Sequence, residues 1–303
     1  MADRRKRDCL VNYPTHWNKD LTKEDASNTE ARVGDYQEVV KGFSDAVTQL
    51  YEYSWGESFH FCRFYKGEAF AATQARHEQY LASTSDAVSQ DLRAGSRFAD
   101  RGREYIEAAG LDDCITFVQG DFTKLTENFP ENEYDAAYAI DATVHAPTWE
   151  SVYGAIHNVL KPGGKFGVYE WCMTDRWDAP NPEHVKLQHE LEYGNGIPEM
   201  LPMKTVRPAL EAVGFEVEHA EDLAERNDKI RWFYPLEGNL SEAQTMGDYV
   251  RVWRLSWLGI WLTHTGVQAA KVLHVASTSL VATGKAKLFT PMYLVVSKKP
   301  ASS

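Results

Sequence analysis

The sequence predicts an α/β fold in which helices cover a parallel sheet. Beyond residue 113, short apolar runs typical of buried strands alternate with segments whose apolar residues recur at helical spacing. Strands that alternate with helices in this way form βαβ units, and the strands of such units are parallel. With 303 residues, of which 43% are hydrophobic, the chain is long enough to bury a substantial core.

The N-terminal part is expected to supply two helices. Residues 1–34 are polar and show no clear period, so we expect a polar extension there. From Asp35 onward, apolar residues recur on one helical face as far as Tyr51, and this helix would lead directly into an aromatic segment. A second helix is expected over Glu68–Leu81.

The central part alternates between strands and helices. The expected strands are short apolar runs, and they cover Cys114–Val118, Tyr134–Ile140, Lys165–Trp171, Phe215–His219 and Leu288–Ser297. The expected helices cover Pro147–Leu160 and Val206–Val213, and another starts at Asn181-Pro182, where a capping residue precedes a first-turn proline. Lys161–Gly164 contains a proline and two glycines, which are expected to stop the first of these helices.

Residues 248–284 have a different composition, rich in tryptophan and small apolar residues. The stretch Leu255–Ala270 carries no Asp, Glu, Lys or Arg, but it is shorter than the ~20 residues that span a bilayer. Arg254 and Lys271 bracket it. We therefore expect no transmembrane helix, and either an amphipathic cap over a lipid pocket or a helix that lies on a membrane surface.

Charge and cysteine content exclude several classes of function. The net charge of −12 argues against nucleic acid as a partner. The four cysteines, at positions 9, 62, 114 and 172, form no C-x-x-C pair, which argues against a structural metal site and fits a reducing compartment. The basic run Arg4–Arg7 is interpreted as a solvated end, with a membrane or targeting patch as the alternative.

The most informative segment is Tyr51–Phe70, YEYSWGESFHFCRFYKGEAF, which is dense in aromatic rings and contains an imidazole. Ring faces at this density hold flat apolar ligands and stabilise nearby positive charge by roughly 0.5–2 kcal/mol per ring. The segment resembles the aromatic signature of the sterol 24-C-methyltransferases. Ser54 stands where that family usually has glycine, and its Cβ would strain a backbone angle that only glycine adopts easily.

Further runs resemble the same family in the same order. They are YAIDATVHAP (138–147), YEWCMTD (169–175), NPEH (181–184), GIP (196–198), GFEV (214–217), EDLA (221–224) and KLFTPM (287–292). The resemblance implies a Rossmann-like class I methyltransferase sheet with a helical C-terminal sterol-binding cap. It divides the chain into a polar N-terminal extension (1–34), a methyltransferase core (35–220) and a C-terminal sterol methyltransferase domain (221–303).

One part of the family pattern is missing. In the family, the sequence ARHE-x-YL, here Ala75–Leu81, is followed by a strand, a glycine-rich turn and a helix that seat the methyl donor. Residues 82–110 of this chain contain no apolar strand run, and their glycines are widely spaced. Because a βαβ unit needs about 30 residues, we expect the sheet to be incomplete at its first βαβ unit, with the core truncated near 82–98.

The resemblance also implies a reaction. S-adenosylmethionine donates a methyl group to the Δ24 alkene of a sterol, and a carbocation forms on the sterol side chain. The candidates for stabilising this positive charge are Tyr51, Tyr53 and Trp55. A base then removes a proton, and the candidate bases, which the sequence does not rank, are Glu52, His60, Asp141 and His145.

Contacts to the methyl donor are expected from Asp121 and Phe122, which follow one predicted strand, and from Ala139 and Asp141, which end another. Ligands bind at the carboxyl ends of strands in sheets of this kind. No metal is required for the reaction, because the sulfonium of the donor is already an activated electrophile.

Several hypotheses stay open at this point. The chain is an active enzyme of this family, an inactive relative that still binds sterol, or an incomplete gene product; a methyltransferase for another triterpenoid is a further alternative. The resemblance implies a sterol substrate and a peripheral position on the cytoplasmic face of the endoplasmic reticulum or on lipid droplets. It is also compatible with a homo-oligomer.

Overall fold

The computed structural model describes residues 13–301 apart from positions 19, 57, 86–106, 108–109, 111–112, 114, 117, 227 and 266–267, and apart from the side chains of residues 46, 49, 257–265 and 268–270. A four-stranded sheet of order β1-β2-β4-β3 forms the centre of the described part. Its strands are β1 (Tyr134–Ile140), β2 (Leu160–Met173), β3 (Glu216–Asp222) and β4 (Phe289–Lys298). All four occupy segments in which strands were predicted.

The sheet is mixed, so the prediction of a purely parallel sheet is wrong for β4. β1 and β2 are parallel, whereas β4 runs antiparallel to both β2 and β3. The reason is that β4 enters the sheet at Phe289, which pairs with Met173 at the carboxyl end of β2. A strand that starts beside the end of its neighbour can only run back along it, and here it lies between β2 and β3.

β2 begins earlier than predicted. Leu160 pairs with Tyr134, and the next partners are Lys165 and Ala136, so Lys161–Gly164 is a bulge within the strand. Gly163 has a φ of 85°, and backbone hydrogen bonds with Lys299 hold the bulge from the other side. The proline and glycines therefore do not separate helix from strand. They form a bulge near the start of the strand itself.

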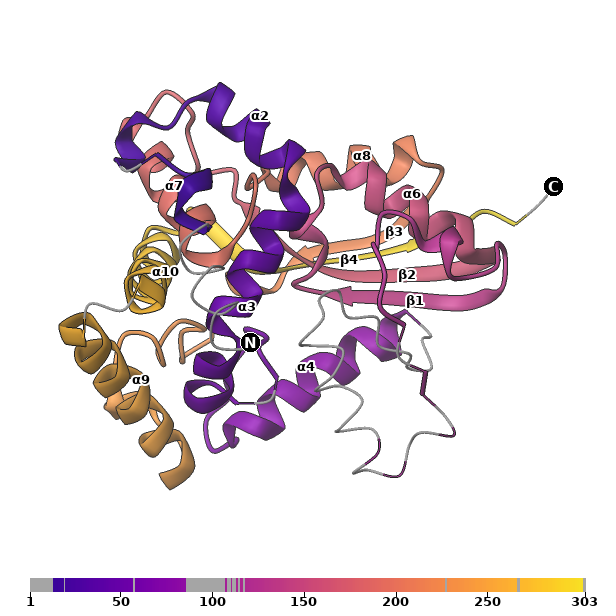
Figure 1. Cartoon of the computed structure of the whole chain (residues 1–303). Helices are drawn as coiled ribbons and strands as arrows, with labels where there is room; N and C mark the ends of the chain where they lie inside the picture. The colour runs from indigo at the N-terminus through magenta and orange to yellow at the C-terminus, as the bar shows by residue number, and fades with distance from the viewer. Residues whose placement is uncertain are drawn as a thin grey trace.

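The helices of the described part surround the sheet (Figure 1). They are α2 (Ala26–Gly34), α3 (Tyr36–Ser54), α4 (Phe70–Thr84), α6 (Trp149–Val159), α7 (Pro182–Asn195), α8 (Val206–Ala212), α9 (Met246–Thr265) and α10 (Gln268–Ala286). α6 and α8 cover one face, and α4 lies against the other (Figure 1). The predicted helices from Asp35, Glu68, Pro147, Asn181 and Val206 are confirmed; Asn181 caps α7 by accepting a hydrogen bond from the backbone of Glu183.

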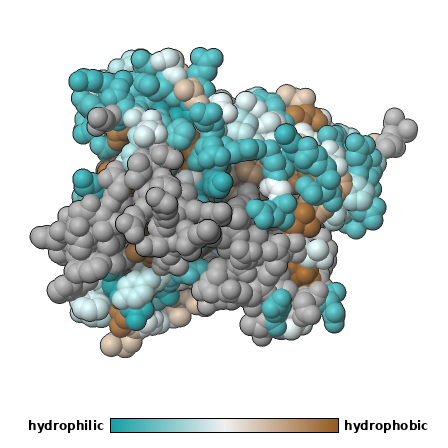
Figure 2. Space-filling model, in the orientation of Figure 1, coloured by the Kyte–Doolittle hydropathy of each residue, from teal (hydrophilic) through white to brown (hydrophobic). Residues whose placement is uncertain are grey.

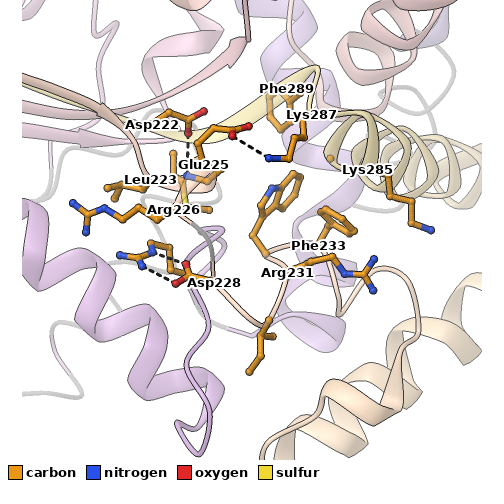
Figure 3. A pocket seen from close by; sticks show the side chains of 16 residues that line it. Asp222, Leu223, Glu225, Arg226, Asp228, Arg231, Phe233, Lys285, Lys287 and Phe289 are labelled. Carbon is orange, nitrogen blue, oxygen red and sulfur yellow. Dashed lines mark hydrogen bonds and ion pairs between the residues drawn. The ribbon is translucent and has the colours of Figure 1, made fainter. Parts of the chain in front are cut away.

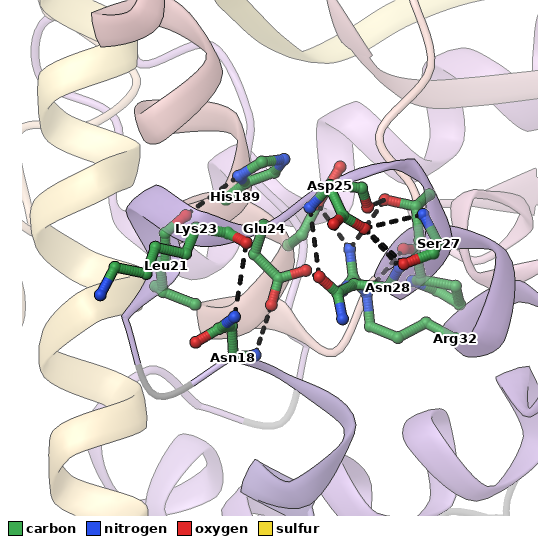
Figure 4. Close-up of polar contacts among 12 residues, drawn as sticks. Asn18, Leu21, Lys23, Glu24, Asp25, Ser27, Asn28, Arg32 and His189 are labelled. Carbon is green, nitrogen blue, oxygen red and sulfur yellow. Dashed lines mark hydrogen bonds and ion pairs between the residues drawn. The ribbon is translucent and has the colours of Figure 1, made fainter.

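The N-terminal extension is more ordered than its composition predicted. Asp25 caps α2 through a capping box with Asn28, and Arg32 at the end of this helix is buried. The Arg32 guanidinium pairs with Glu24, lies 3.4 Å from a carboxylate oxygen of Glu192 and stacks over the Trp17 ring at 4.0 Å. Figure 4 shows the polar contacts around Asp25 and Glu24, with Arg32 on α2 and His189 on α7 close by. A buried guanidinium with two carboxylates thus fastens the extension to the core.

The core lies on both faces of the sheet. One cluster joins the aromatic segment after α3, including Trp55, Phe61 and Phe64, to C-terminal residues such as Trp232 and Phe289. A second cluster packs α6 and α8 on the other face. The regions 35–220 and 221–303 therefore share one hydrophobic core.

The expected loss of a donor-binding unit concerns residues that largely lie outside the described part, as do positions 114 and 117 of the strand expected over Cys114–Val118. Among the described strands, β1 pairs with β2 on one side only. Within the described residues, no helix is long and apolar enough to cross a bilayer.

Cys62 and Cys172 are buried and unbonded. Figure 2 shows a mainly hydrophilic face over α2 and the sheet helices, with pale and brown residues at the lower left, where α9 lies in Figure 1.

Candidate functional site

Asp141 lies at the carboxyl end of β1, where ligands bind in open α/β sheets. Its backbone N–H continues the ladder by donating to Tyr169, and its φ of 54° turns the chain out of the strand. Both carboxylate oxygens are buried, and neither makes a hydrogen bond of normal geometry within the described part of the chain. Burial raises the pKa of Asp141. A buried acceptor of this kind is suited to take a proton or to face a positive charge.

His60 lies beside Asp141, although the two residues come from distant parts of the sequence. His60 Nδ1 is 3.5 Å from Asp141 Oδ2, and His60 Nε2 is 3.8 Å from Glu78 Oε1 on α4. The loop that carries His60 is held against α4, because the Gln74 amide donates to the backbone oxygen of Ser58 and the Ser58 hydroxyl donates to Glu78. Of the four candidate bases, Asp141 and His60 are thus brought together.

The loop after Asp141 is fixed by a buried carboxyl group that the site prediction did not include. Glu170 Oε1 accepts hydrogen bonds from the hydroxyls of Thr143 and, at 2.7 Å, Tyr153. Burial raises the pKa of Glu170 to about 8. Glu170 lies in the run YEWCMTD, so the sequence contained it, but no spacing rule indicated that it would anchor the neighbouring strand end.

The other two candidate bases lie in different surroundings. His145 Nδ1 is 3.1 Å from the backbone oxygen of Gly196, and burial lowers the pKa of His145 to about 4. Glu52 is partly buried on α3. The Nδ1 of His145 is thus engaged by Gly196 rather than by Asp141 or His60.

The aromatic candidates separate into two groups. Trp55 is 3% exposed and packs edge-on against Phe61 and Phe70. Tyr51 is a helical turn away and lies 5.5 Å from the ring of Phe59. Tyr53 is 60% exposed on the other side of α3, because residues two apart in a helix point in different directions.

The strain expected at Ser54 does not occur. Ser54 lies in the last turn of α3, and its hydroxyl donates to the backbone oxygen of Leu50. The unusual backbone angle falls two residues later, at Gly56, where φ is 131°. Serine is therefore compatible with this position.

Of the residues expected to contact the methyl donor, Asp121 already has hydrogen-bond partners within the chain. The Asp121 carboxylate accepts hydrogen bonds from the Tyr36 hydroxyl at 2.9 and 3.0 Å and from the Gln37 amide at 2.8 Å. Burial acts to raise the pKa of Asp121, but hydrogen bonds from Thr123, Tyr36 and Gln37 outweigh it and hold the pKa below its usual value.

Phe122 and Ala139 pack against the cluster on the α6 side of the sheet, whereas Tyr138 and Ile140 pack on the opposite side, toward the aromatic segment. The alternation along β1 thus points Ala139 away from the aromatic segment.

A cavity of about 280 Å³ lies among β3, β4, the end of α10 and the loop that carries Trp232. It is next to the cluster of buried rings that includes Trp55, Phe61 and Trp232, called the aromatic cluster below. Figure 3 shows charged side chains around it, joined in pairs: Arg63 with Asp228 at 2.6 and 2.7 Å, and Lys287 with Glu225 at 3.0 Å. Its aromatic wall includes Trp232, whose ring also contacts Phe61 at 5.1 Å. Trp232 therefore belongs both to the wall of this cavity and to the aromatic cluster.

Comparisons with known proteins agree with the motifs. Residues 266–301 match the family model described as "Sterol methyltransferase C-terminal", and residues 72–168 match "Methyltransferase domain". The sterol 24-C-methyltransferase of Candida albicans is 41% identical over an alignment of 328 positions, which covers 95% of this chain and 86% of that protein. Those of Yarrowia lipolytica and Saccharomyces cerevisiae are 42% and 40% identical, over 93% and 98% of this chain and 84% and 87% of those proteins.

Solved structures show the same fold. The [4+2]-cyclase SpnF matches with a TM-score of 0.63 at 18% identity, covering 88% of this chain and 97% of that one. A geranyl diphosphate C-methyltransferase from Streptomyces coelicolor matches with a TM-score of 0.61 at 10% identity, covering 88% and 98%. The expected α/β methyltransferase fold is thereby confirmed.

The sequence alignments carry one further fact. The alignment to the Candida albicans protein has 328 positions and is thus longer than the 303-residue chain. That relative therefore contains residues that have no counterpart here.

Proposed function

Since the chain belongs to the sterol 24-C-methyltransferase family, we propose that it transfers a methyl group from S-adenosylmethionine to C24 of a Δ24 sterol, a step of ergosterol-type sterol biosynthesis. The observation that carries this proposal is the 41% identity over 95% of the chain. The pair Asp141–His60, held beside the buried aromatic cluster, supports it from the structure.

We expect the chain to supply only some of the contacts that hold the methyl donor. When bound, it supplies a methyl group on a positively charged sulfonium. The carboxylate of Asp141, buried and without a hydrogen bond of normal geometry among the described residues, fits a positive charge. Asp121 fits the adenine amino group only if Tyr36 and Gln37 give up their hydrogen bonds to its oxygens. We therefore place the donor near the end of β1 and expect its binding to be weak.

The sterol side chain would lie between Asp141 and the aromatic cluster. Attack of the alkene on the methyl group leaves a positive charge on the side chain, and ring faces and a nearby carboxylate stabilise such a charge. Trp171 lies next to Asp141 and contacts Phe61 at 5.6 Å, so it joins the rings to the carboxylate. Exposed Tyr53 lies outside this region.

Asp141 is the favoured base. The C–H bond next to the cation breaks, its electron pair forms the new alkene, and the proton passes to a carboxylate oxygen. A base works best when its pKa approaches the working pH, and burial raises the pKa of Asp141 in that direction. His60 at 3.5 Å can then take the proton from Asp141.

We also propose that the protein contacts a membrane peripherally through α9, on the endoplasmic reticulum or on lipid droplets. Met246, Tyr249, Val250 and Trp253 are 78%, 45%, 38% and 48% exposed, and their spacing forms one apolar stripe along the helix. Tryptophan and tyrosine favour the boundary between headgroups and acyl chains. A sterol substrate would reach the chain from such a surface.

The methyl-transfer proposal is tested by incubating the purified chain with donor and two sterols. One has a Δ24 side chain and the other has a saturated side chain. We expect a mass gain only in the Δ24 sterol, because only the alkene can attack; the gain is one carbon and two hydrogens, since a methyl group is added and a proton is lost. No methylated product at millimolar donor, or methylation of both sterols, would overturn the proposal.

A further inference from the structure

Glu78 ends a row of three titratable side chains that begins at Asp141. His60 lies between the two carboxylates, with Nδ1 3.5 Å from Asp141 and Nε2 3.8 Å from Glu78. The side chains become more exposed along the row, from 9% at Asp141 to 18% at His60 and 39% at Glu78. The row thus leads from a buried acceptor to solvent.

We propose that Glu78 is the outlet residue of this row, through which His60 releases the proton taken from the sterol. This rests on the proposed function. Glu78 does not touch the reacting atoms; it acts through His60 and is therefore a positioning residue.

The local structure directs Glu78 toward His60. Glu78 and Gln74 are one helical turn apart on α4, and both bind the loop at Ser58. The other polar side chains of this helix turn have different partners: Arg76 pairs with Glu68 at 2.9 Å, and the buried His77 ring stacks on Tyr169 at 3.9 Å. Glu78 is thus the carboxylate that α4 presents to the imidazole.

The proton is accounted for at each step. Asp141 receives it from the sterol carbon, whose C–H electron pair becomes the alkene. His60 accepts it at Nδ1 and releases the proton of Nε2 to Glu78, which passes it to water. His60 then loses its Nδ1 proton to water and takes up a proton at Nε2, which restores the starting tautomer, and no reactant other than water is needed.

The alternative neighbours do not provide a comparable route. Glu170 is fully buried and receives the hydroxyls of Thr143 and Tyr153. His145 is directed to the backbone oxygen of Gly196. Within the described residues, Glu78 is the group that connects the Asp141–His60 pair with solvent.

The test compares Glu78→Gln and Glu78→Asp with the unaltered chain, using a Δ24 sterol and saturating donor. Glu150→Gln, on the exposed start of α6, is the matched control. We expect Glu78→Gln to lower the rate of alkene formation about tenfold, less than the roughly 10²–10⁴-fold of a direct general acid or base because Glu78 acts through His60, with little change in the KM for sterol. The cation then persists and is captured by water, so methylated alcohol increases relative to methylated alkene.

Glu78→Asp should recover most of the alkene, because it keeps a carboxylate, and Glu150→Gln should match the unaltered chain. Equal product ratios in Glu78→Gln and the unaltered chain would overturn the role of Glu78 alone. If the unaltered chain methylates no sterol, the proposed function fails, and the role of Glu78 fails with it. A rate loss without any change in product ratio, and without recovery in Glu78→Asp, would show a purely structural role and would also overturn the inference.

Discussion

Asp141 Oδ2 and His60 Nδ1 lie 3.5 Å apart at the carboxyl end of β1. The pair depends on two separate features of the fold. The left-handed backbone of Asp141 turns its carboxylate into the interior, and α4 holds the loop that carries His60. Two runs that resemble the sterol 24-C-methyltransferases thus meet at one point, and the chemistry proposed here is centred on them.

Asp141→Asn tests the base directly. The amide keeps the shape of the side chain but cannot accept the proton, so we expect kcat to fall by roughly 10²–10⁴-fold. The melting temperature should stay the same or rise, because a neutral amide is easier to bury than a carboxylate. Steady-state kinetics with saturating donor and a thermal melt check both points. A kcat close to that of the unaltered chain would exclude Asp141 as the base.

Glu170 should make stability depend on pH. Its pKa is raised by burial to about 8 in the folded chain, against about 4.3 when unfolded. Between these values the folded state binds the additional proton, so the free energy of unfolding falls as pH rises, by at most roughly 1.4 kcal/mol per pH unit. Urea unfolding of the unaltered chain should show this loss between about pH 5 and 8.

Glu170→Gln should reduce the slope, because an amide does not titrate in this range, while buried Glu192, whose pKa burial raises to about 7, still contributes. Tyr153 and Thr143 can still donate to its carbonyl oxygen, so the loop after Asp141 should stay in place. The same slope in both proteins would mean that Glu170 does not hold a proton in the folded state.

Much of the fold could be predicted from local pattern. Tyr134–Ile140 was predicted with the bounds that β1 has, and Asn181-Pro182 marked the start of α7, because both depend on neighbouring residues. The direction of β4 could not be predicted. It depends on where α10 ends relative to β2, which is a long-range relationship.

The candidate site was predicted in part for the same reason. Motifs identified His60 and Asp141, but not that they meet, and Glu78 and Glu170 lay in quoted motifs without an assigned role. Tyr53 was grouped with Tyr51 and Trp55 by sequence density alone. Only the helix geometry separates it from them.

A cationic side-chain analogue, such as an aza-sterol, should bind more tightly than the neutral sterol. Ring faces favour positive charge by roughly 0.5–2 kcal/mol per ring, so Trp55→Ala should reduce the preference, while Tyr53→Ala, at an exposed position, should not. Fluorescence titration of both ligands measures it. Because Trp55 is buried, its removal also costs about 3–5 kcal/mol of stability, and the titration must be done at a temperature where a melt shows the variant folded. If the unaltered chain binds the aza-sterol and the neutral sterol equally well, the rings serve only as part of the hydrophobic core.

Donor binding is expected to be weak, because the sequence lacks the glycine-rich turn and Asp121 is already occupied. Each missing charge-assisted hydrogen bond is worth about 1.5–3 kcal/mol, so the loss of several raises the dissociation constant by orders of magnitude. Isothermal titration with S-adenosylmethionine measures it. A micromolar dissociation constant would show that other residues replace the missing contacts.

The most direct test of the account is a mass spectrum of the sterol formed from a donor whose methyl group carries deuterium. The unaltered chain, supplied with a Δ24 sterol and millimolar donor, should yield a product with the labelled methyl group on C24 and one proton lost from the side chain. Asp141→Asn should yield far less of the alkene. A sterol recovered without any label would contradict the proposal that this chain is a methyltransferase.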